Sequence, residues 1–144
     1  MITSDDGLYA IMQREGCVLH AYPDPATGGE PWTIGVGHTG GVQEGDTCTP
    51  ERAQSWLRQD VQIAEKCINN SVRVQLTQNQ FDALVSLVFN IGCGNFGKST
   101  LLRLLNDGDD LKAADEFVKW SKANGHVMQG LLNRRESEKT QFLA

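Results

Sequence analysis

The chain has 144 residues, of which 40% are hydrophobic and 22% charged, with a formal net charge of −5. A chain of this length buries enough surface to fold as one compact domain. Proteins that grip nucleic-acid phosphates or anionic bilayers are normally basic, so we expect neither nucleic acid nor a stable membrane association. No run approaches about 18 apolar residues, and residues 1–13 lack a signal-peptide pattern. We therefore expect a product made without an export signal.

The cysteines and histidines show no metal-ligand spacing and no C-x-x-C pair, so we expect no metal site and no cofactor. Cysteines of a cytoplasmic chain are usually reduced and packed as small hydrophobic residues, which is the state we expect here. Their even number leaves one or two disulfides possible. These residues are Cys17, Cys48, Cys67 and Cys93, and His20, His38 and His126.

The amino-acid composition changes twice along the first half of the chain. Ser4 with two following aspartates caps a helix that runs to about Glu15 and ends at Gly16. Residues 17–47 are rich in Gly, Pro, Asp and Thr, and residues 32–37 (Trp-Thr-Ile-Gly-Val-Gly) alternate like a strand, which predicts a small β lobe. Pro50 then starts a long helix with a continuous apolar face, ending near residue 69, and Ile63 falls off that face.

The second half is predicted to be helical. Thr77 caps a very apolar segment, residues 81–89, that stops at Gly92 and is typical of a buried central helix. Shorter helices are predicted at about residues 100–106, 111–120 and 134–142. Asn-Asp-Gly at residues 106–108 and Asn-Gly at residues 124–125 separate them.

Residues 92–99 (Gly-Cys-Gly-Asn-Phe-Gly-Lys-Ser) match the phosphate-binding loop pattern G-x-x-x-x-G-K-[ST]. Such a loop follows a strand and needs a second apolar strand ending in Asp to hold magnesium. The preceding segment suits a helix better, and no such second strand follows. We therefore interpret these residues as a glycine-rich connection between helices.

Two carboxylates flank the predicted start of the β lobe. Glu15 lies at a helix C-terminus, where the dipole disfavours the ionised form, whereas Asp24 lies between two prolines in a polar loop. Glycosidic bond cleavage needs a protonated acid on one side of the sugar and an ionised carboxylate on the other. A glutamate in the last turn of a helix and an aspartate in a turn are also common without any catalytic role, so their spacing alone does not show that they form a catalytic pair.

Four stretches of the chain together resemble the phage-type lysozymes. They are residues 14–42, residues 76–84 (Leu-Thr-Gln-Asn-Gln-Phe-Asp-Ala-Leu), residues 89–92 (Phe-Asn-Ile-Gly) and residues 132–135 (Leu-Asn-Arg-Arg). The family signature is a Glu, eight residues, an Asp or Cys, five residues and a Thr. Glu15 and Asp24 keep the first spacing, but eight residues separate Asp24 from Thr33, so residues 26–31 carry about three extra.

The resemblance implies roles for five residues. Glu15 would be the general acid, Asp24 the second carboxylate, and Thr33 would help to hold the attacking water, with inversion at the sugar carbon. Arg134 matches a family arginine near the acid, where a cation would oppose the helix-end effect by lowering the Glu15 pKa. His38 would either line the cleft or be a structural imidazole paired with a carboxylate, and we favour the second role. Glu30, in the longer loop, is a rival for the second carboxylate.

The resemblance also implies a fold. We expect an α+β, mainly helical lysozyme-like domain over residues 1–144, with a small N-terminal β-hairpin lobe at about residues 17–48. A connecting helix at about residues 50–69 would join it to a helical lobe at about residues 70–144, packed with the helix at residues 4–15.

The implied function is an endolysin-type muramidase that hydrolyses the β-1,4 bond between N-acetylmuramic acid and N-acetylglucosamine in peptidoglycan. It would be a monomer that waits in the host bacterial cytoplasm until a holin releases it to the periplasm and cell wall. Two alternatives are a lytic transglycosylase, which closes an anhydro ring instead of admitting water, and a non-catalytic wall-binding lysis regulator. Asp24 and Thr33 favour the use of water, and the presence of Glu15 favours an enzyme.

Overall fold

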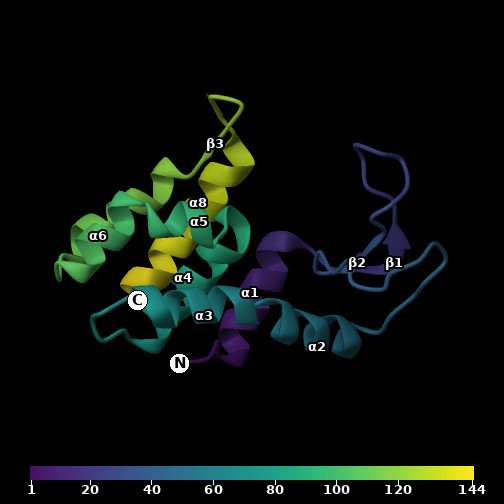
Figure 1. The fold of residues 1–144 in the computed structure, drawn as a ribbon, viewed down its shortest axis with the longest axis horizontal. Coiled ribbons are helices and arrows are strands. Elements are labelled where there is room, and N and C mark those ends of the chain that lie inside the picture. Colours follow the sequence, from purple (N-terminus) through teal and green to yellow (C-terminus); the bar gives the residue numbers. More distant parts are fainter. The chain divides into compact units, whose positions relative to one another are not determined.

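The computed structural model describes residues 1–144 and has the expected α+β fold, with helices and two short antiparallel strand pairs. The chain divides into two compact units (Figure 1). One, the β-lobe unit, is Leu8–Asp60, and the other, the helical unit, combines Met1–Gly7 with Val61–Ala144. None of the helices is long and apolar enough to cross a membrane.

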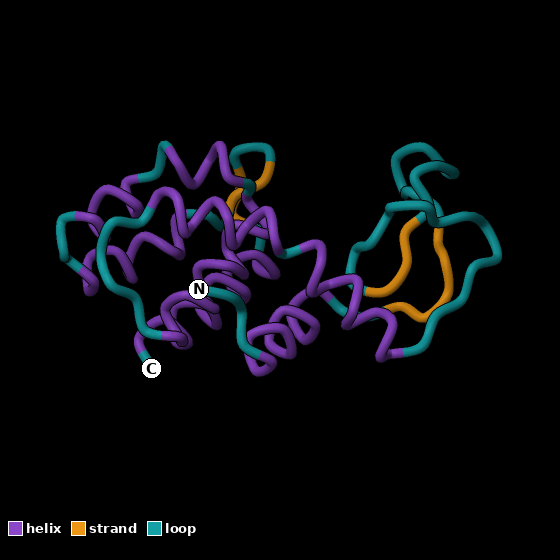
Figure 2. Tube along the Cα trace, turned by 60° about the horizontal axis from the view of Figure 1, so that its bottom comes forward, coloured by secondary structure: helices purple, strands orange, loops and turns teal.

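The β-lobe unit packs a short hairpin on one helix (Figure 2). Strand β2 contacts α2, and the side chains of Ile34, Val36, Ala53 and Leu57 are all buried. A Cβ on Gly35 would lie 3.2 Å from the Cβ of Ala53, so glycine allows the strand to approach the helix closely. The elements of this unit are α1 (Asp5–Glu15, whose first turn belongs to the helical unit), β1 (Val18–Tyr22), β2 (Thr33–Gly35) and α2 (Pro50–Asp60).

The helical unit is built around α4, in which every side chain from Phe81 to Val88 is buried. Thr77 caps α4 with a capping box, because its hydroxyl accepts the Gln80 N–H while the Gln80 side chain accepts the Thr77 N–H. Helix α8 packs against α4. The elements are α3 (Gln62–Ser71), α4 (Gln78–Ile91), α5 (Cys93–Gly97), α6 (Thr100–Asn106), α7 (Asp110–Glu116), the 3-10 helix η1 (Phe117–Lys119), β3 (Lys122–Ala123), β4 (His126–Val127) and α8 (Gln129–Leu143).

Several predicted elements differ in detail from the observed ones. The single helix expected over residues 50–69 is two helices, α2 and α3. Val61 between them has ψ −8°, away from the α-helical value near −42°. Asn124 and Gly125 both have positive φ and turn a small β3–β4 hairpin. The last helix begins at Gln129, five residues before the expected start.

The segment that resembles a phosphate-binding loop connects helices, as expected. The apolar run before it is helix α4, and residues 93–97 form the short helix α5. Because no strand delivers the loop, its backbone N–H groups are not arranged as in a nucleotide site.

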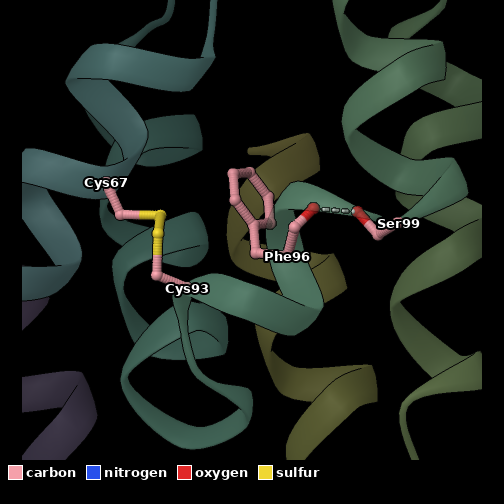
Figure 3. The surroundings of a disulfide bond; sticks show 4 residues. All are labelled: Cys67, Cys93, Phe96 and Ser99. Atoms are coloured by element: carbon pink, nitrogen blue, oxygen red, sulfur yellow. Dashed lines mark hydrogen bonds between the residues drawn. A yellow bond between two sulfur atoms is a disulfide. The ribbon is translucent and has the colours of Figure 1, made fainter.

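The expectation that all four cysteines stay reduced is wrong for one pair. Cys67 on α3 and Cys93 at the start of α5 form a disulfide, with 5.9 Å between their Cα atoms (Figure 3). Next to this bond, Phe96 is buried and its carbonyl accepts the Ser99 hydroxyl at 2.7 Å. Since 26 positions and an entire helix separate the two cysteines, their sequence spacing does not reveal the pairing.

Candidate active site

Glu15 is the last residue of α1, as the sequence predicts, and it is exposed. Gly16 follows with φ +80° and its N–H donates to the Met12 carbonyl at 2.8 Å. A left-handed residue here ends the helix and turns the chain toward β1. The carboxyl group of Glu15 is thus carried on a helix end immediately before the hairpin.

The hairpin register brings Asp24 and Thr33 to one end of the β lobe. Strands β1 and β2 are antiparallel, with Val18 opposite Gly35 and Tyr22 opposite Thr33. Asp24 lies two residues beyond Tyr22, near the start of the loop that connects the strands, and Thr33 is the first residue after that loop. Thr33 is half-buried, and its hydroxyl lies 3.5 Å from the Pro31 carbonyl oxygen.

Asp24 closes the neck of a tight turn that holds the extra loop residues. Its backbone N–H donates to the Gly29 carbonyl at 2.9 Å, and its carbonyl accepts the Gly28 N–H at 2.8 Å. The Ala26 N–H donates to the Asp24 carboxylate at 2.7 Å. The insertion is therefore accommodated beyond Asp24, between residues that bond back to it, and the carboxylate is held at its own turn.

Glu30, the rival carboxylate, lies in a different environment. It is exposed and lines a hollow of about 470 Å³ with Pro31, Trp32, Thr39 and Val42. Its carbonyl accepts the Thr27 hydroxyl at 2.6 Å, which fastens the backbone of the loop tip. No hydrogen bond holds its carboxylate as the Ala26 N–H holds that of Asp24.

Both ring nitrogens of His38 are engaged by acceptors. Nδ1 lies 2.8 Å from an Asp60 carboxylate oxygen, and Nε2 lies 3.0 Å from the Gly40 carbonyl. The imidazole stacks on Trp56 with ring centroids 4.6 Å apart and planes 5° apart, and the Arg52 guanidinium lies 5.1 Å from the Trp56 ring centroid. A ring bonded on both sides and stacked on its face ties β2 and its turn to α2, which favours the structural interpretation.

Arg134 belongs to the helical unit, whereas the other four candidates belong to the β-lobe unit. Its guanidinium bonds to the Glu138 carboxylate at 3.2 Å and to the Ser86 carbonyl at 3.1 Å. These two partners fix the end of the side chain on the α4–α8 pair.

Sequence reasoning missed the partners that hold the candidates in place. Asp60 and Trp56 come from a helix 18 to 22 positions after His38, and nothing in that spacing marks them as neighbours. Glu138 was missed too, but it could have been found, because a carboxylate four residues after Arg134 on one helix is a recognisable ion-pair spacing. The turn at Asp24 could also have been predicted, because an aspartate side chain often accepts the backbone N–H of the residue two positions later and forms an Asx turn.

Comparison with known proteins agrees with this architecture. The sequence pattern of the Phage lysozyme family matches residues 12–138. The chain is 46% identical to an endolysin of Acyrthosiphon pisum secondary endosymbiont phage 1, over 99% of this chain and 98% of that protein. It is 43% identical to an endolysin of Bacillus phage PZA, over 99% of this chain but only 55% of that longer protein.

A solved structure shows the same fold. The crystal structure of a point mutant of P22 lysozyme superposes with a TM-score of 0.93 at 43% identity, covering 100% of this chain and 99% of that one. The family pattern, the full-length relative and the superposition all agree. The chain therefore belongs to the phage lysozyme family.

Proposed function

We propose that this protein is an endolysin that hydrolyses the β-1,4 bond between N-acetylmuramic acid and N-acetylglucosamine in bacterial peptidoglycan, leading to host-cell lysis. Membership of the phage lysozyme family carries this proposal. The placement of Glu15, Asp24 and Thr33 around the first hairpin supports it, because these are the positions that carry the family signature.

In the proposed reaction, Glu15 donates a proton to the bridging oxygen as the bond to the sugar carbon breaks. The Asp24 carboxylate, oriented by the Ala26 N–H, takes a proton from a water molecule that the Thr33 hydroxyl helps to position. The water oxygen forms the new bond on the opposite face of the sugar, so the product carries inverted configuration. Arg134 is a supporting residue, and His38 with Asp60 fastens the turn that follows β2, the strand that Thr33 begins.

Family membership also supports a proposal for the biological setting. An endolysin acts on the wall after release, and we propose that a holin lesion delivers this monomeric protein from the host cytoplasm. A lytic transglycosylase, which the comparisons do not favour, would leave an anhydro sugar lighter than the hydrolysis product by one water. Mass spectrometry of fragments from purified peptidoglycan separates the two, and nuclear magnetic resonance of the fresh product separates inversion from retention.

The decisive variant is Glu15→Gln, which keeps the size of the side chain but removes the proton it would donate. A positioned general acid contributes about 10²–10⁴ in rate, so lysis of wall suspensions should fall by about that factor while the circular dichroism spectrum is unchanged. Glu44→Gln, an exposed glutamate of the same unit, is the matched control and should lyse walls like the parent. Retained activity in a folded Glu15→Gln protein would refute the proposed mechanism.

A further inference from the structure

Two cysteines that are not in the disulfide lie on adjacent segments of the β-lobe unit. Residues 46–48 run antiparallel to residues 19–21, since the Ala21 N–H donates to the Asp46 carbonyl at 2.8 Å and the Cys48 N–H donates to the Leu19 carbonyl at 2.9 Å. The bridge between His20 and Thr47 sets the register and places Leu19 opposite Cys48.

That register puts Cys17 and Cys48 on one face. Cys17 directly precedes β1, and in an extended chain residues two apart share a side, so we infer that Cys17 lies on the side that Leu19 shares with Cys48. The two cysteines are thus diagonal neighbours, at about 7–8 Å in a regular antiparallel pair. Disulfides usually join Cα atoms about 4.4–6.8 Å apart, so a small shift would close this gap.

Cys17 lies close enough to Cys48 to act on its thiol. Burial raises the pKa of the Cys48 thiol, and the charge of the neighbouring Cys17 raises it further. Cys17 is exposed and Cys48 half-buried, so a dissolved oxidant reaches Cys17 first.

We propose that Cys17 and Cys48 form a dithiol that an external disulfide such as oxidised glutathione converts to a second intramolecular disulfide. The Cys17 thiolate attacks one glutathione sulfur, forming a mixed disulfide and releasing one reduced glutathione. The Cys48 thiolate then attacks the Cys17 sulfur and releases the second. Two protein thiols are oxidised and one glutathione disulfide is reduced, and the two protons that leave the cysteines end on the two released glutathione thiols.

The position of the pair connects it to the catalytic end of α1. Only Gly16 separates Cys17 from Glu15, and Gly16 has positive φ that ends the helix. Drawing Cys17 toward Cys48 pulls on this turn and displaces the carboxyl group of Glu15. Misplacement of a reacting group by about 1 Å can cost about 10²-fold in rate, so oxidation should slow hydrolysis. This second step rests on the proposed function, whereas formation of the bond does not.

The bond is tested by incubating the native protein with oxidised glutathione and digesting it, unreduced, with a protease that cuts after glutamate. Cleavage at Glu44 separates the two cysteines, so mass spectrometry should find their fragments joined and lighter by two hydrogen atoms than the sum of the free fragments. Cys48→Ser should instead stop at a glutathione adduct on Cys17. Two glutathione adducts on the native chain, or disulfide-linked dimers, would overturn the proposal.

The effect on Glu15 is tested by comparing lysis rates before and after the same oxidation. The native protein should lose up to about 10²-fold in rate. Cys17→Ser, which keeps the Cys67–Cys93 bond, should be unaffected by the treatment. A confirmed bond with an unchanged rate would overturn the coupling to Glu15. Failure of the proposed function would show separately, as full lysis by Glu15→Gln in the reduced state.

Discussion

Asp24 keeps its place although the loop that follows it is longer than in the family signature. The backbone of Asp24 bonds to Gly28 and Gly29, and its carboxylate accepts the Ala26 N–H. These bonds fold the longer segment back onto Asp24 as a local turn. The geometry therefore favours Asp24 over Glu30 as the second carboxylate, since Glu30 is exposed and lies beyond this turn.

Asp24→Asn should accordingly reduce wall lysis by about 10²–10⁴, because the neutral amide cannot take a proton from the attacking water. Glu30→Gln is the matched control, with the same charge change at the other end of the same loop, and we expect nearly full activity. Turbidity assays at equal protein concentration measure both. The reverse order of effects would assign the second carboxylate to Glu30.

Gly7, in the first turn of α1, shows how a small residue can be required by its neighbour. A Cβ at this position would lie 2.5 Å from the Cγ of Asp82, a buried residue whose carboxylate accepts the Ser4 hydroxyl. Gly7→Ala improves helix propensity by about 1 kcal/mol, but overpacking costs about 1–3 kcal/mol, and displacing Asp82 also disturbs the Ser4 bond. We expect a net loss of stability in urea unfolding.

Gly130→Ala is the control for this experiment. Gly130 also lies in the first turn of a helix, but a Cβ there would meet nothing within 4 Å. It should stabilise the protein by about 0.5–1 kcal/mol through helix propensity alone. Stabilisation by both alanines would show that Asp82 moves aside without cost.

At the scale of single residues, the sequence predicts where helices begin and end better than it predicts which residues contact one another. The helix end at Glu15 followed by Gly16 and the cap at Thr77 were both predicted, because each depends on residues within a few positions. The partners of His38 and of Cys67 come from other elements. Those pairings depend on how the elements pack, which local preference does not determine.

At the scale of elements, a buried ionic cluster joins α4 to α8. Glu138 is fully buried, and its carboxylate accepts the Ser86 hydroxyl at 2.5 Å and pairs with Arg134 at 3.2 Å and Arg135 at 2.6 Å. Two guanidinium groups thus share one carboxylate away from water. Arg135, also fully buried, donates to the Trp120 carbonyl as well, which extends the cluster to the end of η1.

Glu138→Gln should therefore destabilise the protein by about 3–5 kcal/mol, because it leaves buried guanidinium groups without their negative partner. Urea unfolding followed by circular dichroism measures this loss. Glu136→Gln, an exposed glutamate of the same helix, should change stability by less than about 0.5 kcal/mol. Equal, small effects at both positions would mean that the cluster contributes little to stability.

Elements that are marked by strong local sequence patterns were predicted, and elements whose sequence patterns are weak were not. The central helix α4 has a capping box, a continuous apolar run and a glycine end, and it lies where expected. The break at Val61 lies inside an uninterrupted apolar pattern, so periodicity could not show it. The β3–β4 hairpin did have a signal, since Asn-Gly is the commonest two-residue hairpin turn, but its strands are too short to show alternation.

At the scale of the whole molecule, the disulfide restrains the unfolded chain. Cys67 and Cys93 close a loop of 26 positions, and the loop-entropy relation gives about 3.5 kcal/mol for a loop of this length. Replacing both cysteines by serine should lower the free energy of unfolding by up to about that amount. A reducing agent should destabilise the parent but not the double variant. Equal stability of the two proteins would show that the bond adds nothing under those conditions.

The turn closed by Asp24 has a consequence for engineering. Because Gly28 and Gly29 both bond to the backbone of Asp24, residues added between these two glycines would project outward and leave the strand register untouched. Exposed tips with small residues are where foreign segments are most readily accepted. A cell-wall recognition peptide inserted after Gly28 would thus lie close to Asp24 and could be used to change the range of cell walls that the enzyme binds.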